Sequence, residues 1–324
     1  MTKVKWGVLG TAGIARGCTI PGMKEADNCD LYAIAGRDEA KVNDFKEEFG
    51  FAKGYAGYEK LLEDPEVSAV YIPLPNNLHK EWVIKALEAK KHVLCEKPLS
   101  LSEADVKEMF DAAEKNNVLL MEAYAYLHSP YITQLKSDID SGMIGDVDYI
   151  ETAFVTQGYL DDIRIRKETG GGAVYDLGCY CTTIIGYLTG MQPDTVMANA
   201  EFNDKGVDIF TSVMMLYKSG LRAAFNVGMI FPAGCEARQD RLFVHGSKGT
   251  IRSDVEFNQA GELKYMVQAA GKTTERIVSA RQNYALETEQ FGRCIINGED
   301  PHVSRDFSVA NARTIDTILK KIGY

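Results

Sequence analysis

The segment "WGVLGTAGIA", residues 6 to 15, joins an apolar strand, Val4–Leu9, to a glycine-rich turn at the start of a helix. Small residues at such a turn let the backbone approach a pyrophosphate, whose charge then lies at the helix N-terminus. The match to GxGxxG is imperfect because Ala12 and Ala15 occupy two glycine positions, so an ordinary tight turn is the alternative. The residues predicted to contact a dinucleotide here are Gly10, Thr11, Ala12, Gly13 and Ile14.

Residues 1–123 alternate short apolar runs with helical patterns, which is typical of parallel strands joined by crossover helices. Asp38 is predicted to cap one helix, and Ser102 with Asp105 resembles a capping box before another. The predicted strands are Val4–Leu9, Leu31–Ala35, Ala69–Ile72, His92–Cys95 and Val118–Glu122. We therefore expect a Rossmann-like, doubly wound parallel sheet in a domain formed by residues 1–123.

The pattern changes in residues 124–324, where longer strand-like runs are separated by turn signals such as "NDKG", "KSG" and "GSKG". Helices are expected near the glycines at 170–172 and over 284–296 and 304–322. The predicted strands are Asp148–Thr156, Thr195–Phe202, Ile209–Tyr217, Arg222–Val227 and Arg241–Val244. The second domain is thus predicted to be α+β with a large, mostly antiparallel open sheet, and the whole chain falls in the α/β class.

Composition excludes several classes of function. The net charge of −10 at pH 7 argues against a nucleic-acid partner, which needs a basic surface. The seven cysteines form no CxxC pair, and their odd number favours a reducing cytoplasm. The five histidines are scattered along the chain, so the spacing of a metal site is missing. The N-terminus enters an apolar strand without a signal peptide, and no apolar run reaches membrane length, so we predict a cytoplasmic protein without a membrane partner.

The second and fourth strands end in polar residues at the sheet edge where ligands bind in such folds. Arg37 stands where an acid usually grips the ribose hydroxyls, and a guanidinium can pair with a 2′-phosphate, so NADP is favoured and NAD stays possible. A solvated surface charge is the alternative for Arg37. The loop "PLPNNLH" is predicted to contact the nicotinamide half of the cofactor, with a helix cap and a packed imidazole as alternatives for its polar members. Its predicted contact residues are Pro73, Leu74, Asn76 and His79.

The fifth strand ends in "HVLCEKPLS", residues 92 to 100. The ammonium of Lys97 can hydrogen-bond a substrate oxygen and stabilise the alkoxide-like charge that develops during hydride transfer. Proline gives the turn a fixed φ that aims the preceding side chain. Glu96 is predicted to contact the cofactor, and a solvated loop is the alternative for the whole turn.

Four segments, "GVLGTAGIA", "PLPNNLH", "CEKPLS" and "GGGAVYDLGCY", have the order and spacing seen in the Gfo/Idh/MocA oxidoreductases, which the chain resembles over nearly its whole length. The resemblance implies an N-terminal Rossmann domain and a C-terminal domain whose open sheet commonly forms a subunit interface, hence a homodimer or homotetramer. It also implies a catalytic and substrate-positioning role for Lys97 beside the nicotinamide.

The glycines at 170–172 precede a helix on which Asp176 and Tyr180 lie four residues apart, hence on one face. Many family members carry histidine at the second position; tyrosine there resembles the branch of dimeric dihydrodiol dehydrogenase and glucose-fructose oxidoreductase, whose tyrosine is the acid/base. A phenol with a pKa of roughly 10 is a poor base, but the ammonium of Lys97 would stabilise its phenolate. Asp176 is predicted to orient substrate or tune this pair; an ordinary buried carboxylate is the alternative.

The substrate is less defined, because Leu127 in "MEAYAYLHSP" stands where the branch often carries arginine. Tyr124 and Arg164 are predicted substrate contacts, with a surface loop charge as the alternative for Arg164. The resulting hypothesis is an NADP(H)-dependent dehydrogenase or reductase acting on a CH–OH group of a sugar, polyol or trans-dihydrodiol. Two alternatives stay open: a catalytically silent cofactor-binding regulator, and a glycosidase that uses bound NAD for transient oxidation.

Overall fold

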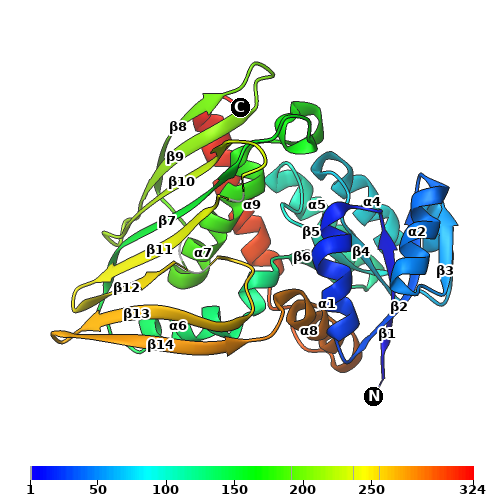
Figure 1. Ribbon diagram of the computed structural model, residues 1–324, viewed down its shortest axis with the longest axis horizontal. Coiled ribbons are helices and arrows are strands. Elements are labelled where there is room, and N and C mark those ends of the chain that lie inside the picture. Colours follow the sequence, from blue (N-terminus) through cyan, green and yellow to red (C-terminus); the bar gives the residue numbers. More distant parts are fainter. Residues whose placement is uncertain (1, 191, 236, 255) are drawn as a thin grey trace. The chain divides into compact units, whose positions relative to one another are not determined.

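The computed structural model describes residues 2–190, 192–235, 237–254 and 256–324. They form two compact units, each built around its own sheet (Figure 1). The first unit comprises the chain up to His128 together with Arg281–Val309, and the second comprises Ser129–Ala280 with Ala310–Tyr324. The division into functional domains at residues 1–123 and 124–324 stays a prediction. It differs from the compact units because Arg281–Val309 belongs to the first unit.

The first unit contains a six-stranded parallel sheet of order β3-β2-β1-β4-β5-β6. Its strands are β1 (Val4–Leu9), β2 (Cys29–Gly36), β3 (Lys53–Ala56), β4 (Ala69–Ile72), β5 (His92–Glu96) and β6 (Leu120–Ala123). The order reverses between β1 and β4, and in open α/β sheets ligands bind at the carboxyl ends of the strands beside such a switch point. The predicted doubly wound sheet is confirmed. The edge strand β3 was not predicted, because it is mostly exposed and lacks an apolar run.

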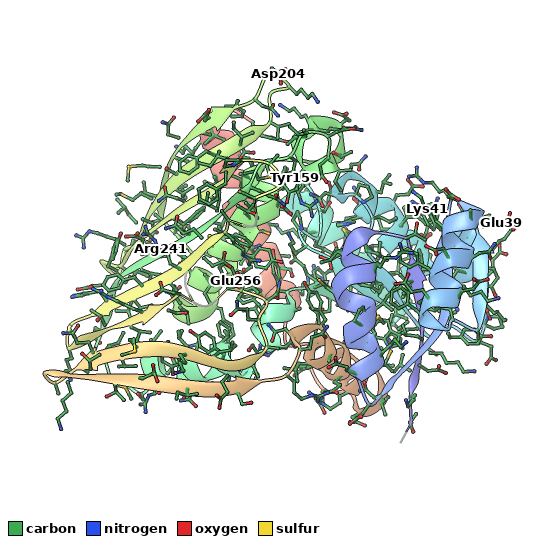
Figure 2. All side chains as sticks on the ribbon, in the orientation of Figure 1. Glu39, Lys41, Tyr159, Asp204, Arg241 and Glu256 are labelled. Atoms are coloured by element: carbon green, nitrogen blue, oxygen red, sulfur yellow. The ribbon has the colours of Figure 1, made fainter. Side chains whose placement is uncertain are left out.

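Helices join these strands as the local sequence signals indicate. The Asp38 side chain accepts from the backbone N–H of Lys41, and Ser102 accepts from Asp105, so both predicted caps are confirmed. The helices of this unit are α1 (Ile20–Glu25), α2 (Glu39–Phe49), α3 (Tyr58–Leu62), α4 (Asn76–Glu88), α5 (Glu103–Asn116) and α8 (Asn283–Asn297), with the short turn η2 at Ala125–His128. Figure 2 shows Glu39 and Lys41 in the first turn of α2, where both side chains are exposed.

The described residues of the second unit form an eight-stranded sheet of order β14-β13-β12-β11-β7-β10-β9-β8, in which β10 and β7 are parallel and the other neighbouring strands are antiparallel. Its strands are β7 (Val147–Gln157), β8 (Thr195–Phe202), β9 (Asp208–Leu216), β10 (Arg222–Phe231), β11 (Gln239–Gly246), β12 (Gly249–Ser253), β13 (Gly261–Ala269) and β14 (Lys272–Ala280). The helices α6 (Pro130–Asp140), α7 (Cys179–Thr189) and most of α9 (Arg305–Ile322) lie along one face (Figure 1). The predicted mostly antiparallel sheet is confirmed.

Side chains alternate across this sheet. In β13, for example, Leu263, Tyr265 and Val267 are buried while the residues between them are exposed. This alternation gives the sheet one apolar face for the helices and one face that carries exposed side chains. The exposed large apolar residues of its strands are Met197, Phe202, Met214, Ile230, Met266 and Ile277.

Within the part of the chain that the structure describes, none of the helices combines the length and the apolar character needed to cross a bilayer. The seven cysteines are free thiols, and Cys29, Cys95 and Cys181 are among the buried ones. Burial raises the pKa of each of these three thiols. They therefore pack as small apolar side chains.

Candidate functional site

The glycine turn after β1 leaves its backbone accessible. Gly10 has a φ of +137°, and its N–H donates to the carbonyl of Ala35 at 2.9 Å. A Cβ at Gly10 would lie 3.1 Å from the Leu74 side chain, whereas a Cβ at Gly13 would meet no described atom within 4 Å. The helix that begins here continues through a wide π turn, Ala15–Thr19, into α1. An open backbone at a helix N-terminus fits the pyrophosphate of a dinucleotide.

Arg37 follows the last residue of β2 and is exposed. A Cβ at the preceding Gly36 would lie 3.3 Å from the Thr11 side chain, so the end of β2 packs directly against the glycine turn. The guanidinium also lies beside the hydroxyl of Tyr58, where its charge opposes the rise that burial causes in the pKa of that phenol. Arg37 therefore follows a strand end that packs against the glycine turn. Its predicted role, binding of a 2′-phosphate, stays a prediction.

His79 ties together the loops that follow β4 and β5. Its imidazole is fully buried, with Nδ1 2.9 Å from the carbonyl oxygen of Pro98 and Nε2 2.7 Å from that of Leu74. Both ring nitrogens are thus directed at backbone groups of this unit. This geometry favours the packed imidazole over a direct cofactor contact. Of the other predicted contact residues in this loop, Pro73 and Leu74 are buried and Asn76 is half-buried.

The charged pair after β5 divides into a buried and a more exposed member. The Glu96 carboxylate accepts from the Tyr71 hydroxyl at 2.6 Å and from the backbone N–H of Lys97 at 3.2 Å. Thr19, in the π turn, lies 2.8 Å from the same Tyr71 hydroxyl. Glu96 therefore links β4, β5 and the first helix, while the half-buried Lys97 is carried at the sheet edge.

The turn that carries Lys97 is held from a third strand. Glu122, in β6, is buried and accepts from the backbone N–H of Leu99 at 2.9 Å. Burial raises the pKa of Glu122 to about 7, and the positive charge of Lys97 opposes part of that rise. His79 and Glu122 thus fix the two sides of the turn. The next predicted residue, Tyr124, is fully buried and packs edge-on against Tyr126 at 6.3 Å between ring centroids.

In the second unit, the glycines at 170–172 close a loop that starts after β7. The N–H of Gly172 donates to the carbonyl of Arg164 at 2.8 Å, and a Cβ at Gly171 would lie 2.5 Å from that same oxygen. Gly172 has a φ of +124°, and a Cβ there would lie 2.2 Å from Asp208. Only glycines allow this close approach.

Asp208 caps the helix that follows the glycines. Its buried carboxylate accepts from the backbone N–H of Val174 at 2.9 Å and from the Thr211 hydroxyl at 2.9 Å. Burial raises the pKa of Asp208 to about 6. The carboxylate fixes the start of the π turn Val174–Gly178, which leads into α7 and carries Asp176.

The side chains of Asp176 and Tyr180 have different partners in this unit. Arg164 donates through Nε to the Asp176 carboxylate at 2.9 Å and through Nη1 to Asp162 at 3.1 Å, and it stacks near the Tyr159 ring. Figure 2 labels Tyr159 in the loop after β7. The Asp176 charge raises the pKa of Arg164, so the pair is ionised.

The Tyr180 ring lies between two phenylalanines. Its centroid is 5.4 Å from that of Phe154 and 5.2 Å from that of Phe257. Its hydroxyl receives a hydrogen bond from the side-chain amide of Asn258 at 3.3 Å. The ring is therefore held by packing while its hydroxyl has a polar partner.

The N-terminal and C-terminal parts of the chain each match a known family of domains. Residues 4–124 match "Oxidoreductase family, NAD-binding Rossmann fold", and residues 132–252 match the "GFO/IDH/MocA C-terminal domain". The chain is 36% identical to D-xylose 1-dehydrogenase (NADP(+)) 2 of Haloferax volcanii, covering 97% of this chain and 96% of that protein. The chain belongs to the GFO/IDH/MocA oxidoreductase family.

Two further relatives span nearly the whole chain. Trans-1,2-dihydrobenzene-1,2-diol dehydrogenase of Xenopus laevis is 31% identical, covering 98% of each chain. A 3-ketoreductase from Actinomadura kijaniata, solved in complex with NADP and TDP-benzene, superposes with a TM-score of 0.92 at 28% identity, covering 99% of this chain and 98% of that one. The predicted family, fold class and oxidoreductase activity of this GFO/IDH/MocA member are confirmed.

Several residues around these sites were not predicted. Tyr71 lies in an apolar run and shows no polar signal of its own, and Asp208 contacts a residue 34 positions away. Asn258 is 78 positions from Tyr180, in a segment without a recognisable motif. The available signal for Asn258 was weak: an amide directly after an aromatic residue, in a segment for which no element was predicted.

Proposed function

We propose that this GFO/IDH/MocA member is an NADP(H)-dependent oxidoreductase that interconverts a secondary alcohol and a carbonyl in a sugar, a polyol or a trans-dihydrodiol. The observation that carries the proposal is the Lys97 turn, which Glu122 and His79 fix at the carboxyl edge of the parallel sheet, in the same unit as the open glycine turn. An ammonium carried on a turn whose backbone is fixed at that edge suits a reacting oxygen better than a mobile surface lysine would.

The glycine turn at residues 10–14 would hold the pyrophosphate, and Arg37 the 2′-phosphate, of the cofactor. When bound, the cofactor supplies or accepts the hydride. NADP appears in the name of the Haloferax volcanii relative and in the solved structure of the Actinomadura kijaniata ketoreductase, which supports the choice of NADP over NAD. Pro73, Leu74, Asn76 and Glu96 are proposed to line the nicotinamide end, with His79 holding their loops.

Lys97 is proposed to hydrogen-bond the reacting oxygen of the substrate and to stabilise the negative charge that grows on it. Tyr180 is proposed to take the hydroxyl proton during oxidation and to return it during reduction. Asp176 would orient Arg164 toward the substrate, since their side chains are paired at 2.9 Å. Tyr124 stays a proposed neighbour of the substrate.

The substrate class is proposed from the relatives, which are named for D-xylose and for a dihydrobenzene diol. The ketoreductase was solved with a TDP compound, so a nucleotide-linked sugar belongs on the list of substrates to test. A cofactor-binding regulator and an NAD-dependent glycosidase remain the competing functions. The dehydrogenase and reductase names of the relatives favour a net redox reaction.

We also propose that the chain forms a homodimer or homotetramer through the exposed face of the eight-stranded sheet. Met197, Met214, Met266 and Ile277 are between 38% and 55% exposed there, although they are large apolar side chains. Sedimentation or light scattering of the wild-type chain and of Ile277→Lys tests this proposal. A cytoplasmic location likewise stays a proposal, supported by the free thiols.

The test of the proposed function measures nicotinamide absorbance with NADP⁺ against aldoses, polyols, trans-dihydrodiols and TDP-sugars. Lys97→Met and Tyr180→Phe should each lower kcat by roughly a hundredfold or more while NADP⁺ still binds. The matched controls are Lys107→Met, which removes an exposed lysine paired with Glu103, and Tyr149→Phe, which removes a hydroxyl bonded to Glu151. Equal rates in the Lys97 variant and its control would refute the proposed role of Lys97.

A further inference from the structure

The hydroxyl of Tyr180 has a polar partner that belongs to the segment between β12 and β13. Asn258 donates through Nδ2 to the Tyr180 oxygen at 3.3 Å. The other amide atom, Oδ1, is buried and has no hydrogen-bond partner among the residues that the structure describes. The amide N–H group is therefore directed at Tyr180, and the amide oxygen accepts no hydrogen bond from the described backbone around it.

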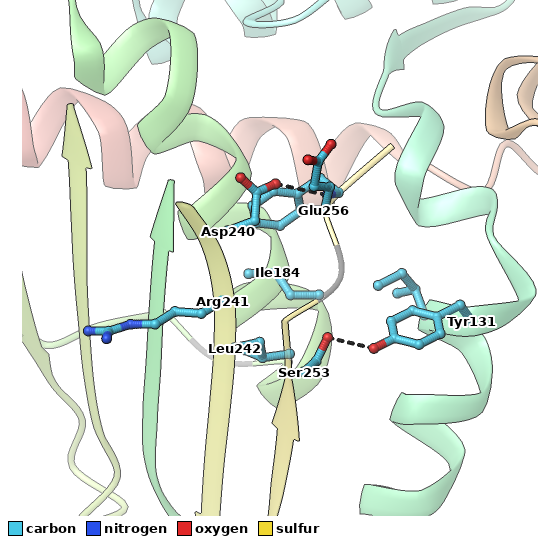
Figure 3. A pocket seen from close by; sticks show the side chains of 9 residues that line it. Tyr131, Ile184, Asp240, Arg241, Leu242, Ser253 and Glu256 are labelled. Carbon is cyan, nitrogen blue, oxygen red and sulfur yellow. Dashed lines mark hydrogen bonds between the residues drawn. The ribbon is translucent and has the colours of Figure 1, made fainter. Parts of the chain in front are cut away.

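The segment that carries Asn258 is clamped to β11 by an ion pair. Asp240 is buried and accepts from Arg238 twice, at 2.7 Å from Nε and at 2.6 Å from Nη2. The same carboxylate accepts from the backbone N–H of Phe257 at 3.0 Å, and Glu256 lies 3.4 Å from Arg238. Figure 3 shows Asp240 and Glu256 close together at this point. The position of Asn258 is thus set by contacts of its two predecessors.

Aromatic packing completes the clamp. The Phe257 ring stacks on Phe154 with centroids 5.4 Å apart and an interplanar angle of 26°, and both rings contact Tyr180. The Arg238 guanidinium lies 4.3 Å from the centroid of the Phe154 ring. Burial disfavours the Arg238 charge, but Asp240, Glu256 and Tyr180 outweigh that cost and raise its pKa. A positive charge therefore acts on the Tyr180 hydroxyl from within the same unit.

The neighbouring cavity does not compete as a ligand site. It is lined by Tyr131, Ser253 and Phe257, among others, and its volume of about 20 Å³ has room for one water molecule. Figure 3 shows that Ser253 and Tyr131 are already bonded to each other across it. Among the described residues of this region, the side chain that donates to the Tyr180 hydroxyl is Asn258.

We propose that Asn258 is a positioning residue that sets the protonation equilibrium of Tyr180, held in place by the Arg238–Asp240 clamp. This inference rests on the proposed function of Tyr180 as the proton-transfer group. A neutral phenol can donate to the amide oxygen, whereas a phenolate has no proton and can only accept from the amide N–H. By rotating about its last bond, one amide serves both states, and in the ionised state it forms the stronger bond.

The expected shift in the ionisation of Tyr180 follows from the free energy of a hydrogen bond to an ionised group. Such a bond shifts the ionisation equilibrium by roughly ten- to a hundredfold, which is roughly one to two pH units. Removal of the amide should therefore move the rise of kcat with pH, in the direction of alcohol oxidation, upward by that amount. At a pH above this shifted rise, kcat of the variant should return to the wild-type level.

The test compares pH profiles of kcat for the wild type, Asn258→Leu and Asn258→Asp. Leucine removes the polar partner at nearly constant volume, and aspartate replaces a donor with a negative charge, so the shift should be larger for aspartate. Gln259→Leu is the matched control, because it removes the next amide along the chain, and its profile should coincide with that of the wild type. Asn258→Ser, which restores a small hydroxyl donor, should recover part of the shift and serves if the leucine variant fails to fold.

A second readout does not depend on turnover. The enzyme is labelled with ¹³Cζ-tyrosine, the Tyr180 signal is assigned by its loss in Tyr180→Phe, and its pKa is measured in the wild type and in Asn258→Leu. A higher pKa in the variant supports the inference. An unchanged pKa together with an unchanged profile overturns it, even where Tyr180→Phe has lost activity. Normal turnover in Tyr180→Phe would instead overturn the proposed role of Tyr180, a result that the NMR titration separates from the first.

Discussion

Glu122 should make the stability of the first unit depend on pH, because this residue is only 2% exposed. Burial raises its pKa from 4.5 to about 7, against the opposing effects of its hydrogen bonds and of Lys97. The folded state therefore favours the protonated carboxyl, whereas the unfolded chain ionises it from about pH 4.5 upward. Folding thus loses stability as the pH rises from the unfolded value through the folded one.

The magnitude follows from the two pKa values. Each pH unit between them costs about 1.4 kcal/mol, so the full cost above the folded pKa is roughly 3 kcal/mol, and only about 1.4 kcal/mol of it has been reached at about pH 5.5. Glu122→Gln keeps an oxygen acceptor for the Leu99 N–H and cannot ionise. Its free energy of unfolding, relative to the wild type, should therefore rise by about 2 kcal/mol between about pH 5.5 and about pH 8.5.

The assay is urea unfolding followed by tryptophan fluorescence. The chain has 2 tryptophans, Trp6 and Trp82, and both lie in the first unit, so the signal reports on the unit that contains Glu122. Glu47→Gln, at an exposed position on α2, is the control and should show no such change. If the free-energy difference between Glu122→Gln and the wild type stayed constant across this pH range, the reasoning would be refuted.

Three other predictions concern the cofactor turn, the packing of α1 and the substrate loop. Arg37→Ala should weaken NADP⁺ binding by roughly tenfold or more and NAD⁺ binding by less than roughly twofold, measured by fluorescence titration; equal losses for both would remove Arg37 from 2′-phosphate recognition. Gly22→Ala should destabilise the first unit by roughly 1 to 3 kcal/mol in urea unfolding, because its Cβ would lie 2.2 Å from Gln282, whereas Gly17→Ala, with no described atom within 4 Å, should not. Arg164→Met should raise the KM of the substrate by roughly tenfold in steady-state assays and leave the KM of NADP⁺ unchanged; a change confined to the cofactor would contradict its assignment.

The sequence predicted those elements whose signals are local. The strand Val4–Leu9 and the caps at Asp38 and Ser102 match the structure, because hydrophobic period and capping act over a few residues. The strand β13 was missed, although its side chains alternate between buried and exposed, because the turn glycine at 261 and the charged residues around it resemble a loop. Segments with weak apolar runs need their neighbours in the sheet to be recognised.

Features that depend on distant packing could not be predicted. Glu287, in the middle of α8, would be taken for a surface charge, yet it is fully buried, and its carboxylate has no hydrogen-bond partner among the described residues. Burial raises its pKa well above the usual range. The packing of α8 in the first unit, rather than with the segment that precedes it, likewise depends on contacts such as that between Asn28 and Glu289, 261 positions apart.

The most direct test of the proposed function measures the molar ratio of NADPH formed to product formed. With an active substrate and excess NADP⁺, the account predicts one NADPH formed for each molecule of substrate oxidised, and loss of both signals in Lys97→Met. Product formed without NADPH would contradict a net dehydrogenase and favour transient oxidation by bound NAD, and tight NADP⁺ binding without product from any substrate class would favour a regulator.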